Sequence, residues 1–303
     1  MNPQFLVDGL VAGSVIGLGA VGVTLTYAIL RFANFAHGEF VTAGAYLTLT
    51  LAGVIGGVLP GLMAPLGSLT ASGALLLALV PGLALTALLA LGLDAVLFRP
   101  LRAKGEAIVA VMASFGASLA LRSLIEAIFS SRPAYFSRAL QIARPLGEGL
   151  RATPNQIAAV LAAVAVAVLV HLMLTRTRAG RAMRAVSENP SLAAAGGVDV
   201  GAVVRLTWLL GATLAGFAGV VVGLLVQIRP FMGFDLLLPL FAAAILGGIG
   251  SVPGAMLGGL IVGLSEAAAV ALIGAPWRGA VAFGILIVVL LIRPAGLFGV
   301  RAR

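Results

Sequence analysis

Long apolar stretches recur along the whole chain and constrain its fold more than any other feature. Nine of them fall at residues 5–30, 41–59, 72–98, 107–130, 154–175, 204–226, 236–250, 254–273 and 278–292. A helix of about 20 apolar residues crosses the roughly 30 Å hydrocarbon core of a bilayer, where backbone polar groups must be satisfied internally. The sequence therefore predicts an all-α, polytopic membrane helix bundle that forms a single transmembrane domain over residues 1–303. We expect eight to nine spans, because glycine and proline interrupt residues 236–273 and favour broken or re-entrant segments there.

The distribution of charge supports a membrane protein and argues against other classes. Only 10% of the residues are charged, whereas soluble domains carry about 25%. The net charge of +9 comes mainly from arginines in the connections, so we attribute it to positive-inside topology and not to nucleic-acid binding. Arginine clusters at 99–104, at 176–184 and near the C-terminus predict a cytoplasmic C-terminus. The absence of cysteine excludes disulfides and thiolate metal sites, and no catalytic grouping is present, so we expect no enzyme and no metal site.

A polar stretch, RFANFAHGEF at residues 31–40, follows the first apolar stretch. Polar and charged groups inside or beside a bilayer are costly, which marks them as candidates for a functional site. Two interpretations remain open. The side chains contact a transported substrate, or they hydrogen-bond backbone groups that a break in the helix frees. The candidates for lining a translocation path are Asn34, Phe35, His37, Gly38 and Glu39.

A similar arrangement recurs in the second half of the chain. A glycine-ridged apolar stretch leads into RPFMGFD at residues 229–235, as another leads into residues 31–40. With alternating spans the two copies point in opposite directions, and inverted repeats with interrupted segments are typical of transporters that bind substrate at the repeat interface. We therefore predict an inverted repeat and add Phe231 and Asp235 to the path candidates. Glycines spaced by four along residues 9–17 predict close helix packing.

Five further charged residues lie in or near apolar stretches. Glu266 lies deep within one and must face a partner, a cavity or an interface, so it joins the path candidates. Arg122 and Glu126 are four residues apart on one helix face, and we expect them to neutralise each other. Asp94 and Glu106 lie near the ends of stretches, where we expect their side chains to reach water.

The polar connection at residues 176–205 predicts a compact helix-turn-helix. We expect a short basic helix over 179–186, a turn at Asn189-Pro190, and a second short helix that starts from an N-cap at Ser191. Gly196-Gly197 would end the second helix. Such an element suits a membrane subunit that receives force from a soluble partner.

Three segments resemble signatures of bacterial branched-chain amino-acid ABC-transporter permeases. Residues 34–40 resemble the first signature, residues 181–198 resemble the ATPase-coupling loop, and residues 246–259 resemble a C-terminal signature. The resemblance implies a multi-pass subunit of the bacterial cell inner membrane that moves branched-chain or other hydrophobic amino acids. It also implies partners: a second, homologous permease or a second copy of the chain, two cytoplasmic ATPases that hydrolyse ATP, and a periplasmic substrate-binding protein.

The resemblance assigns an ATPase-coupling role to part of the 176–205 connection. The family loop often carries an acidic pair where this chain has Glu188-Asn189-Pro190, which leaves the docking contacts open. No cofactor is expected on this chain itself. The coupling residues are Arg181, Arg184, Glu188, Asn189, Pro190 and Gly196.

Alternative functions remain open at this point. The only lysine, Lys104, lacks the pattern of a P-loop, so ATP would have to act through a partner. A proton-coupled secondary transporter of a small solute would instead work alone through Glu39 and Glu266, although a solitary carrier needs no docking element. Relatives of the resembled family carry urea or other small molecules, so the resemblance restricts the substrate only loosely.

Overall fold

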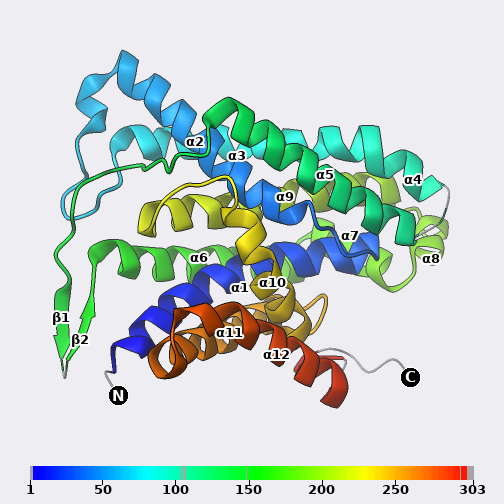
Figure 1. Cartoon of the computed structure of the whole chain (residues 1–303). Helices are drawn as coiled ribbons and strands as arrows, with labels where there is room; N and C mark the ends of the chain where they lie inside the picture. The colour runs from blue at the N-terminus through cyan, green and yellow to red at the C-terminus, as the bar shows by residue number, and fades with distance from the viewer. Residues whose placement is uncertain (1–2, 104, 106, 148, 294, 299–303) are drawn as a thin grey trace.

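The computed structural model describes residues 3–103, 105, 107–147, 149–293 and 295–298, and its regular structure is almost entirely helical (Figure 1). Within these ranges the sheet consists of one short hairpin, β1 (Arg144–Gly147) and β2 (Leu150–Ala152). The prediction of an all-α bundle is confirmed. The helices are α1 (Gln4–Leu30), α2 (His37–Val58), α3 (Gly73–Leu93), α4 (Arg99–Ala103), α5 (Ala107–Phe129), α6 (Pro154–Arg176), α7 (Arg178–Glu188), α8 (Pro190–Ala195), α9 (Val200–Leu225), α10 (Met232–Gly247), α11 (Val252–Ile273) and α12 (Arg278–Ile292).

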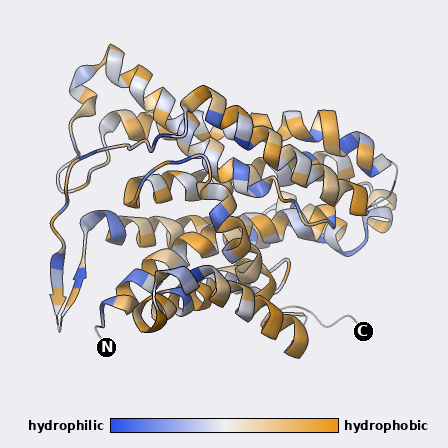
Figure 2. Cartoon of the chain, in the orientation of Figure 1, coloured by the Kyte–Doolittle hydropathy of each residue, from blue (hydrophilic) through white to orange (hydrophobic). Residues whose placement is uncertain are grey.

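Eight helical segments in the described ranges are long and apolar enough to cross a membrane, the last of them being α12 together with the 3-10 turn Ala275–Trp277 that precedes it, so the chain is a multi-pass membrane protein. α10 is not among them, because its 16 residues extend only about 24 Å at 1.5 Å per residue. Residues 236–273 therefore hold most of one short helix and all of one long helix. Hydrophobic residues dominate the long helices, and hydrophilic residues concentrate in the hairpin and the connections (Figure 2).

The connections gather at two opposite ends of the bundle (Figure 1). α4, α7 and α8 lie at one end, which we call the α7–α8 end, and the β1–β2 hairpin and the start of α1 lie at the other, the hairpin end. Near the α7–α8 end, a π-helical turn at Asp94–Phe98 joins α3 to α4. Asp94 is buried and accepts a hydrogen bond from Arg102, so the expectation that it reaches water is wrong. A buried carboxylate needs a paired charge. Glu106 lies outside the described residues.

Glycines bring α1 and α11 into close antiparallel contact. A Cβ atom added to Gly9 or Gly13 would lie 2.8 Å from the Cα atom of Leu264 or Leu260, respectively. Gly17 faces Met256 in the same register. Backbones that approach this closely leave no room for larger residues, as in the small-residue interfaces by which membrane helices associate. The glycine spacing in the first apolar stretch thus serves packing inside this chain.

Two interrupted helix pairs organise the centre of the bundle. Six residues, 31–36, separate α1 from α2, and six residues, 226–231, separate α9 from α10. The first break starts at the α7–α8 end, where Arg31 contacts α7. The second starts at the hairpin end, where Ile228 pairs with Ala134 in the connection before the hairpin. The breaks therefore lie at opposite ends of the bundle, as an inverted repeat requires.

Both α2 and α10 start inside the bundle and not at its ends. The His37 ring lies against Gly19 and Gly22, in the middle of α1, and α10 starts beside the first turns of α2. A Cβ atom on Gly38 would lie 2.6 Å from the carbonyl oxygen of Gly233. The two helix starts thus meet inside the bundle. This shared geometry agrees with an inverted repeat for these two helix pairs.

Candidate functional site

The first break is built by its own polar residues. Arg31 ends α1 in the left-handed conformation, with a φ of 58°. Asn34 is buried, and its Oδ1 accepts a hydrogen bond from the backbone N–H of Ala36, at 3.1 Å. The backbone N–H of Phe35 donates to Ser114 Oγ at 3.0 Å. These bonds satisfy backbone groups that the break frees, which is the second of the two interpretations left open for this stretch.

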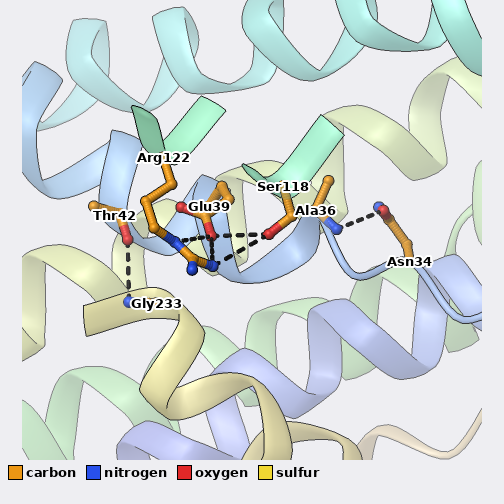
Figure 3. A network of polar contacts seen from close by, with 7 residues as sticks. All are labelled: Asn34, Ala36, Glu39, Thr42, Ser118, Arg122 and Gly233. Atoms are coloured by element: carbon orange, nitrogen blue, oxygen red, sulfur yellow. Dashed lines mark hydrogen bonds and ion pairs between the residues drawn. The ribbon is translucent and has the colours of Figure 1, made fainter. Parts of the chain in front are cut away.

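Glu39 and Arg122 form a buried ion pair next to the break (Figure 3). The Glu39 side chain is 0% exposed, and its Oε1 accepts from Arg122 Nη2 at 2.8 Å and from Ser118 Oγ at 3.0 Å. The expected pairing of Arg122 with Glu126 is therefore wrong. Helical spacing places those two residues on one face, but a fully buried carboxylate on α2 needs the guanidinium more than the less buried Glu126 does.

Arg122 also connects the first break to the second. Its guanidinium lies over the rings of Phe231 and Phe234, with centroid distances of 5.0 and 4.1 Å. A cation held over an aromatic face inside a protein is stabilised by about 0.5–2 kcal/mol. The backbone N–H of Gly233 donates to Thr42 Oγ1 at 3.0 Å, which links the start of α10 to α2 (Figure 3). We call the cluster of Glu39, Thr42, Arg122, Phe231 and Gly233 the central junction.

The central junction leaves no space between the two helix starts. A Cβ atom on Gly233 would lie 1.8 Å from the carbonyl oxygen of Gly38, a separation that no larger residue tolerates. Gly38 therefore has a packing role. His37 is buried beside it, and its Nε2 lies 3.3 Å from the carbonyl oxygen of Gly19. These two path candidates are buried in the packing beside the central junction.

An open cleft of about 1190 Å³ lies on the hairpin side of the junction, lined by α1, α6, α9, α10, α11 and the connection at residues 135–141. Asp235 and Glu266, both predicted path residues, lie on its walls. Asp235 pairs with Arg229 at 2.9 Å, each side chain being 50% exposed. Glu266 pairs with Arg278 at 2.7 Å. Ion pairs within membrane-spanning bundles face the bundle interior or water, and the half-exposed Arg229–Asp235 pair places charged groups in this largely apolar cleft.

The structure separates the remaining path candidates. Phe35 lies away from the cleft, with its ring 6.0 Å from that of Phe115 and 5.8 Å from that of Phe241. Phe231 belongs to the central junction through Arg122. The candidates thus occupy three places: the break, the junction and the cleft. Two arginines that were not among the candidates take part in these places: Arg122 pairs with Glu39 in the junction, and Arg278 pairs with Glu266 at the cleft. No local pattern in the sequence indicates these two partners.

Two short helices occupy the 176–205 connection, in the predicted order. Thr177 caps α7, and its Oγ1 accepts from the N–H of Gly180 at 3.1 Å. Asn189 caps α8, and its Oδ1 accepts from the N–H of Leu192 at 3.0 Å. The predicted N-cap at Ser191 is therefore wrong. Pro190 is the first residue of α8, where its missing N–H costs nothing. α8 ends at Ala195 with Gly196 as its C-cap, as expected.

α7 has one face on the bundle and another free of it. Gly180, Met183 and Val186 are buried, while the charged residues of the predicted coupling set remain exposed. Arg184 also donates to the carbonyl oxygen of Leu174 at 2.9 Å, near the end of α6. The exposed members of that set are Arg181, Arg184, Glu188, Asn189 and Gly196, and Pro190 is half-buried.

Comparison with known proteins finds one matching family and relatives from that family that align with nearly the whole chain. Residues 5–290 match the family described as branched-chain amino acid transport system / permease component. The high-affinity branched-chain amino acid transport system permease protein BraD of Pseudomonas aeruginosa is 34% identical over 301 residues, covering 98% of this chain and 95% of that protein. The corresponding permease protein LivH of Escherichia coli is 32% identical over 314 residues, covering 99% of this chain and 98% of that protein.

One solved structure shares the fold. The structure titled PsaBC from Streptococcus pneumoniae in complex with Fab aligns with a TM-score of 0.50 at 14% sequence identity, covering 96% of this chain and 93% of that one. At this identity the likeness concerns the fold alone. Eight spans, two helix breaks that meet inside the bundle and an open cleft that contains ion pairs define a multi-pass membrane transport protein. The match over nearly the whole chain shows that it belongs to the branched-chain amino acid transport permease family, and it is a transport subunit of the ABC permease class.

Proposed function

We propose that this chain is the membrane subunit of an ATP-driven importer in a bacterial inner membrane. Its cargo is a branched-chain or other hydrophobic amino acid, delivered by a periplasmic binding protein. The observation that carries the proposal is the meeting of the α2 and α10 starts at the central junction, directly below the cleft. Relatives that cover the whole chain are named as permeases for branched-chain amino acids, which supports this cargo.

The path is assigned to the cleft and the central junction. The cleft opens at the hairpin end, which we assign to the periplasm, and the junction closes its inner end. The cleft combines apolar walls, including Val15 and Leu236, with the Arg229–Asp235 pair. Apolar walls suit the side chain of a hydrophobic amino acid, and a few polar groups suit its charged end. A second permease, homologous or identical, would complete the path on its open side.

The exposed face of α7 and α8 is assigned to ATPase docking on the cytoplasmic side, and the C-terminus lies on that side. Arg31 links this element to the first break, because its guanidinium donates to the carbonyl oxygens of Ser187 and Glu188, each at 3.1 Å. Movement of α7 would thus reach the start of α2 through a few bonds. ATP itself is bound and hydrolysed by two partner subunits, and no cofactor is assigned to this chain.

Reconstitution in proteoliposomes tests the function. The chain is combined with its second permease, the two ATPases and the binding protein, and leucine uptake is driven either by ATP or by a proton gradient. The proposal predicts uptake that requires ATP and the binding protein. Uptake by this chain alone under a proton gradient would favour the proton-coupled carrier instead, and uptake of urea without leucine would reassign the cargo.

Two substitutions test the coupling element. Glu188→Ala and Gly196→Pro change exposed residues of the α7–α8 connection, so the bundle stays folded. We expect ATP hydrolysis to continue while leucine transported per ATP falls at least about tenfold, because a lost docking contact of about 1.4 kcal/mol corresponds to that factor. Arg144→Ala changes an exposed arginine of β1 that does not line the cleft, and it serves as the control. Unchanged transport in both α7–α8 variants would remove the coupling assignment.

A further inference from the structure

A second polar site lies in the wall of the cleft toward the hairpin end. Glu266 on α11 is 2% exposed and Arg278, the first residue of α12, is 52% exposed. They share a single hydrogen bond, from Arg278 Nε to Glu266 Oε2 at 2.7 Å. Both residues line the large cleft and a smaller adjoining one of about 390 Å³. The Arg278 guanidinium is therefore accessible between two adjoining hollows, while the Glu266 carboxylate lies in their shared wall and is shielded.

Each member of this pair retains unused hydrogen-bonding capacity. Glu266 Oε1 is buried and has no hydrogen-bond partner among the described residues. Among the described residues, neither of the two terminal amino groups of Arg278 has a hydrogen-bond or ion-pair partner. A buried oxygen without a donor costs about 1–3 kcal/mol, and more when it is charged. The arrangement therefore favours a ligand that supplies a donor to Glu266 and an acceptor to Arg278.

We infer that Glu266 and Arg278 bind the charged end of a zwitterionic α-amino acid. Its ammonium group donates to Glu266 Oε1, and its carboxylate accepts from the terminal amino groups of Arg278. Asp8 also lines both hollows, which adds negative charge and favours the ammonium group. Val11, Ala12 and Val15 of α1 provide an apolar surface beside the pair for the side chain. The inference rests on the proposed function and adds a cargo-binding site at the outer part of the path.

Labelling of a single introduced thiol tests this site, because the chain contains no native cysteine. Ala12→Cys places that thiol on the wall that both hollows share with Glu266 and Arg278. The complete transporter, without binding protein, is held in phosphatidylglycerol nanodiscs, which lack the zwitterionic lipid headgroups that could compete. We measure the rate at which a water-soluble maleimide labels the introduced thiol. At a leucine concentration ten times the dissociation constant, labelling should slow by about tenfold through mass action.

Two analogues with the same branched side chain separate the charges. 4-Methylpentanoate lacks the ammonium group and 3-methylbutylamine lacks the carboxylate. At the concentration at which leucine protects, neither should protect, because each leaves one member of the pair unsatisfied. Equal protection by either analogue would overturn the inference. This comparison uses the Ala12→Cys chain with the pair intact, so it does not depend on whether changes to the pair fold.

Substitutions of the pair provide the second arm. Glu266→Gln and Arg278→Met should abolish leucine protection, and Arg278→Lys should retain part of it. Arg205→Met, which removes a more exposed ion-paired arginine from α9, is the matched control. Protection that persists in Glu266→Gln and Arg278→Met, or its absence in a preparation that imports leucine with ATP, would overturn the site and leave the proposed function standing. Failure of ATP-driven leucine import by the complete transporter would contradict the proposed function itself.

Discussion

At the residue scale, Arg122 is the side chain that contacts both α2 and the start of α10 in the centre of the bundle. It neutralises the fully buried Glu39 on α2 and covers the rings of Phe231 and Phe234 at the start of α10. One guanidinium therefore holds both helix breaks. A buried carboxylate that loses its partner costs about 3–5 kcal/mol, whereas loss of an exposed charge costs little.

Replacement of Arg122 tests this role. Arg122→Met should lower the stability of the purified transporter by about 3–5 kcal/mol, because Glu39 remains buried without a counter-charge. Glu126→Gln, on the same helix, is the control and should change stability by less than about 1 kcal/mol. Thermal unfolding followed by intrinsic fluorescence measures both variants. The double variant Glu39→Gln/Arg122→Met should recover most of the lost stability. Equal destabilisation by Arg122→Met and Glu126→Gln would contradict the pairing of Arg122 with Glu39.

Gly233 provides a second test at this scale. Gly233→Ala would force a Cβ atom against the carbonyl oxygen of Gly38, so we expect loss of folded, monodisperse protein. Gly53→Ala in α2 is a suitable control, since its Cβ atom meets no neighbour within 4 Å. Size-exclusion chromatography after expression separates the outcomes. Normal yield of Gly233→Ala would show that the two helix starts do not meet as described.

At the element scale, a direct contact joins the first helix break to the α7–α8 connection. Arg31 ends α1 and holds the last two residues of α7, Ser187 and Glu188, by their carbonyl oxygens. A guanidinium at the C-terminal ends of two helices is also favoured by both helix dipoles. The link therefore joins the proposed docking element to the start of the path.

Removal of this link should weaken coupling without preventing assembly. We expect the Arg31→Ala variant to keep its ATPase partners on purification. The amount of leucine transported per ATP should fall about fivefold or more, because the variant loses two hydrogen bonds from a charged donor. Arg31→Lys should recover part of this ratio, while Arg205→Ala should leave it unchanged. The ratio is measured by parallel uptake and phosphate-release assays. An unaltered ratio in Arg31→Ala would show that force does not pass through this contact.

The sequence predicted the elements better than it predicted their contacts. Apolar length is a local property, so the spans and the two short helices of 176–205 were predictable, and proline and glycine indicated the interrupted region of α10. The partner of Glu39 was not predictable from the sequence. Arg122 lies far away along the chain and reaches Glu39 only because of how α5 is rotated and how deeply α2 starts in the folded bundle. The cap of α8 shifted from Ser191 to Asn189 because Pro190 favours the first helical position.

At the scale of the whole molecule, the two breaks enter from opposite ends and meet in the middle. The central junction closes the space between the two helix starts, and the cleft lies on one side of it. Inverted repeats of this kind permit two related conformations, each closed at a different end. We therefore expect the junction to open toward the α7–α8 end when the cleft closes.

Access to the cleft during the transport cycle tests this account most directly. Leu236→Cys places a single thiol on the α10 wall of the cleft. Ile142→Cys, at a position 88% exposed in the connection at the hairpin end and outside the cleft, is the control. In the complete reconstituted transporter, an impermeant maleimide added at the hairpin side should label the Leu236→Cys variant readily without ATP. We expect labelling at least about tenfold slower in the ATP-bound state, with the rate for Ile142→Cys unchanged, as a shift of about 1.4 kcal/mol between the two conformations predicts. Equal labelling of the Leu236→Cys variant in both states, in a preparation that imports leucine, would contradict a path that runs through the cleft and the central junction.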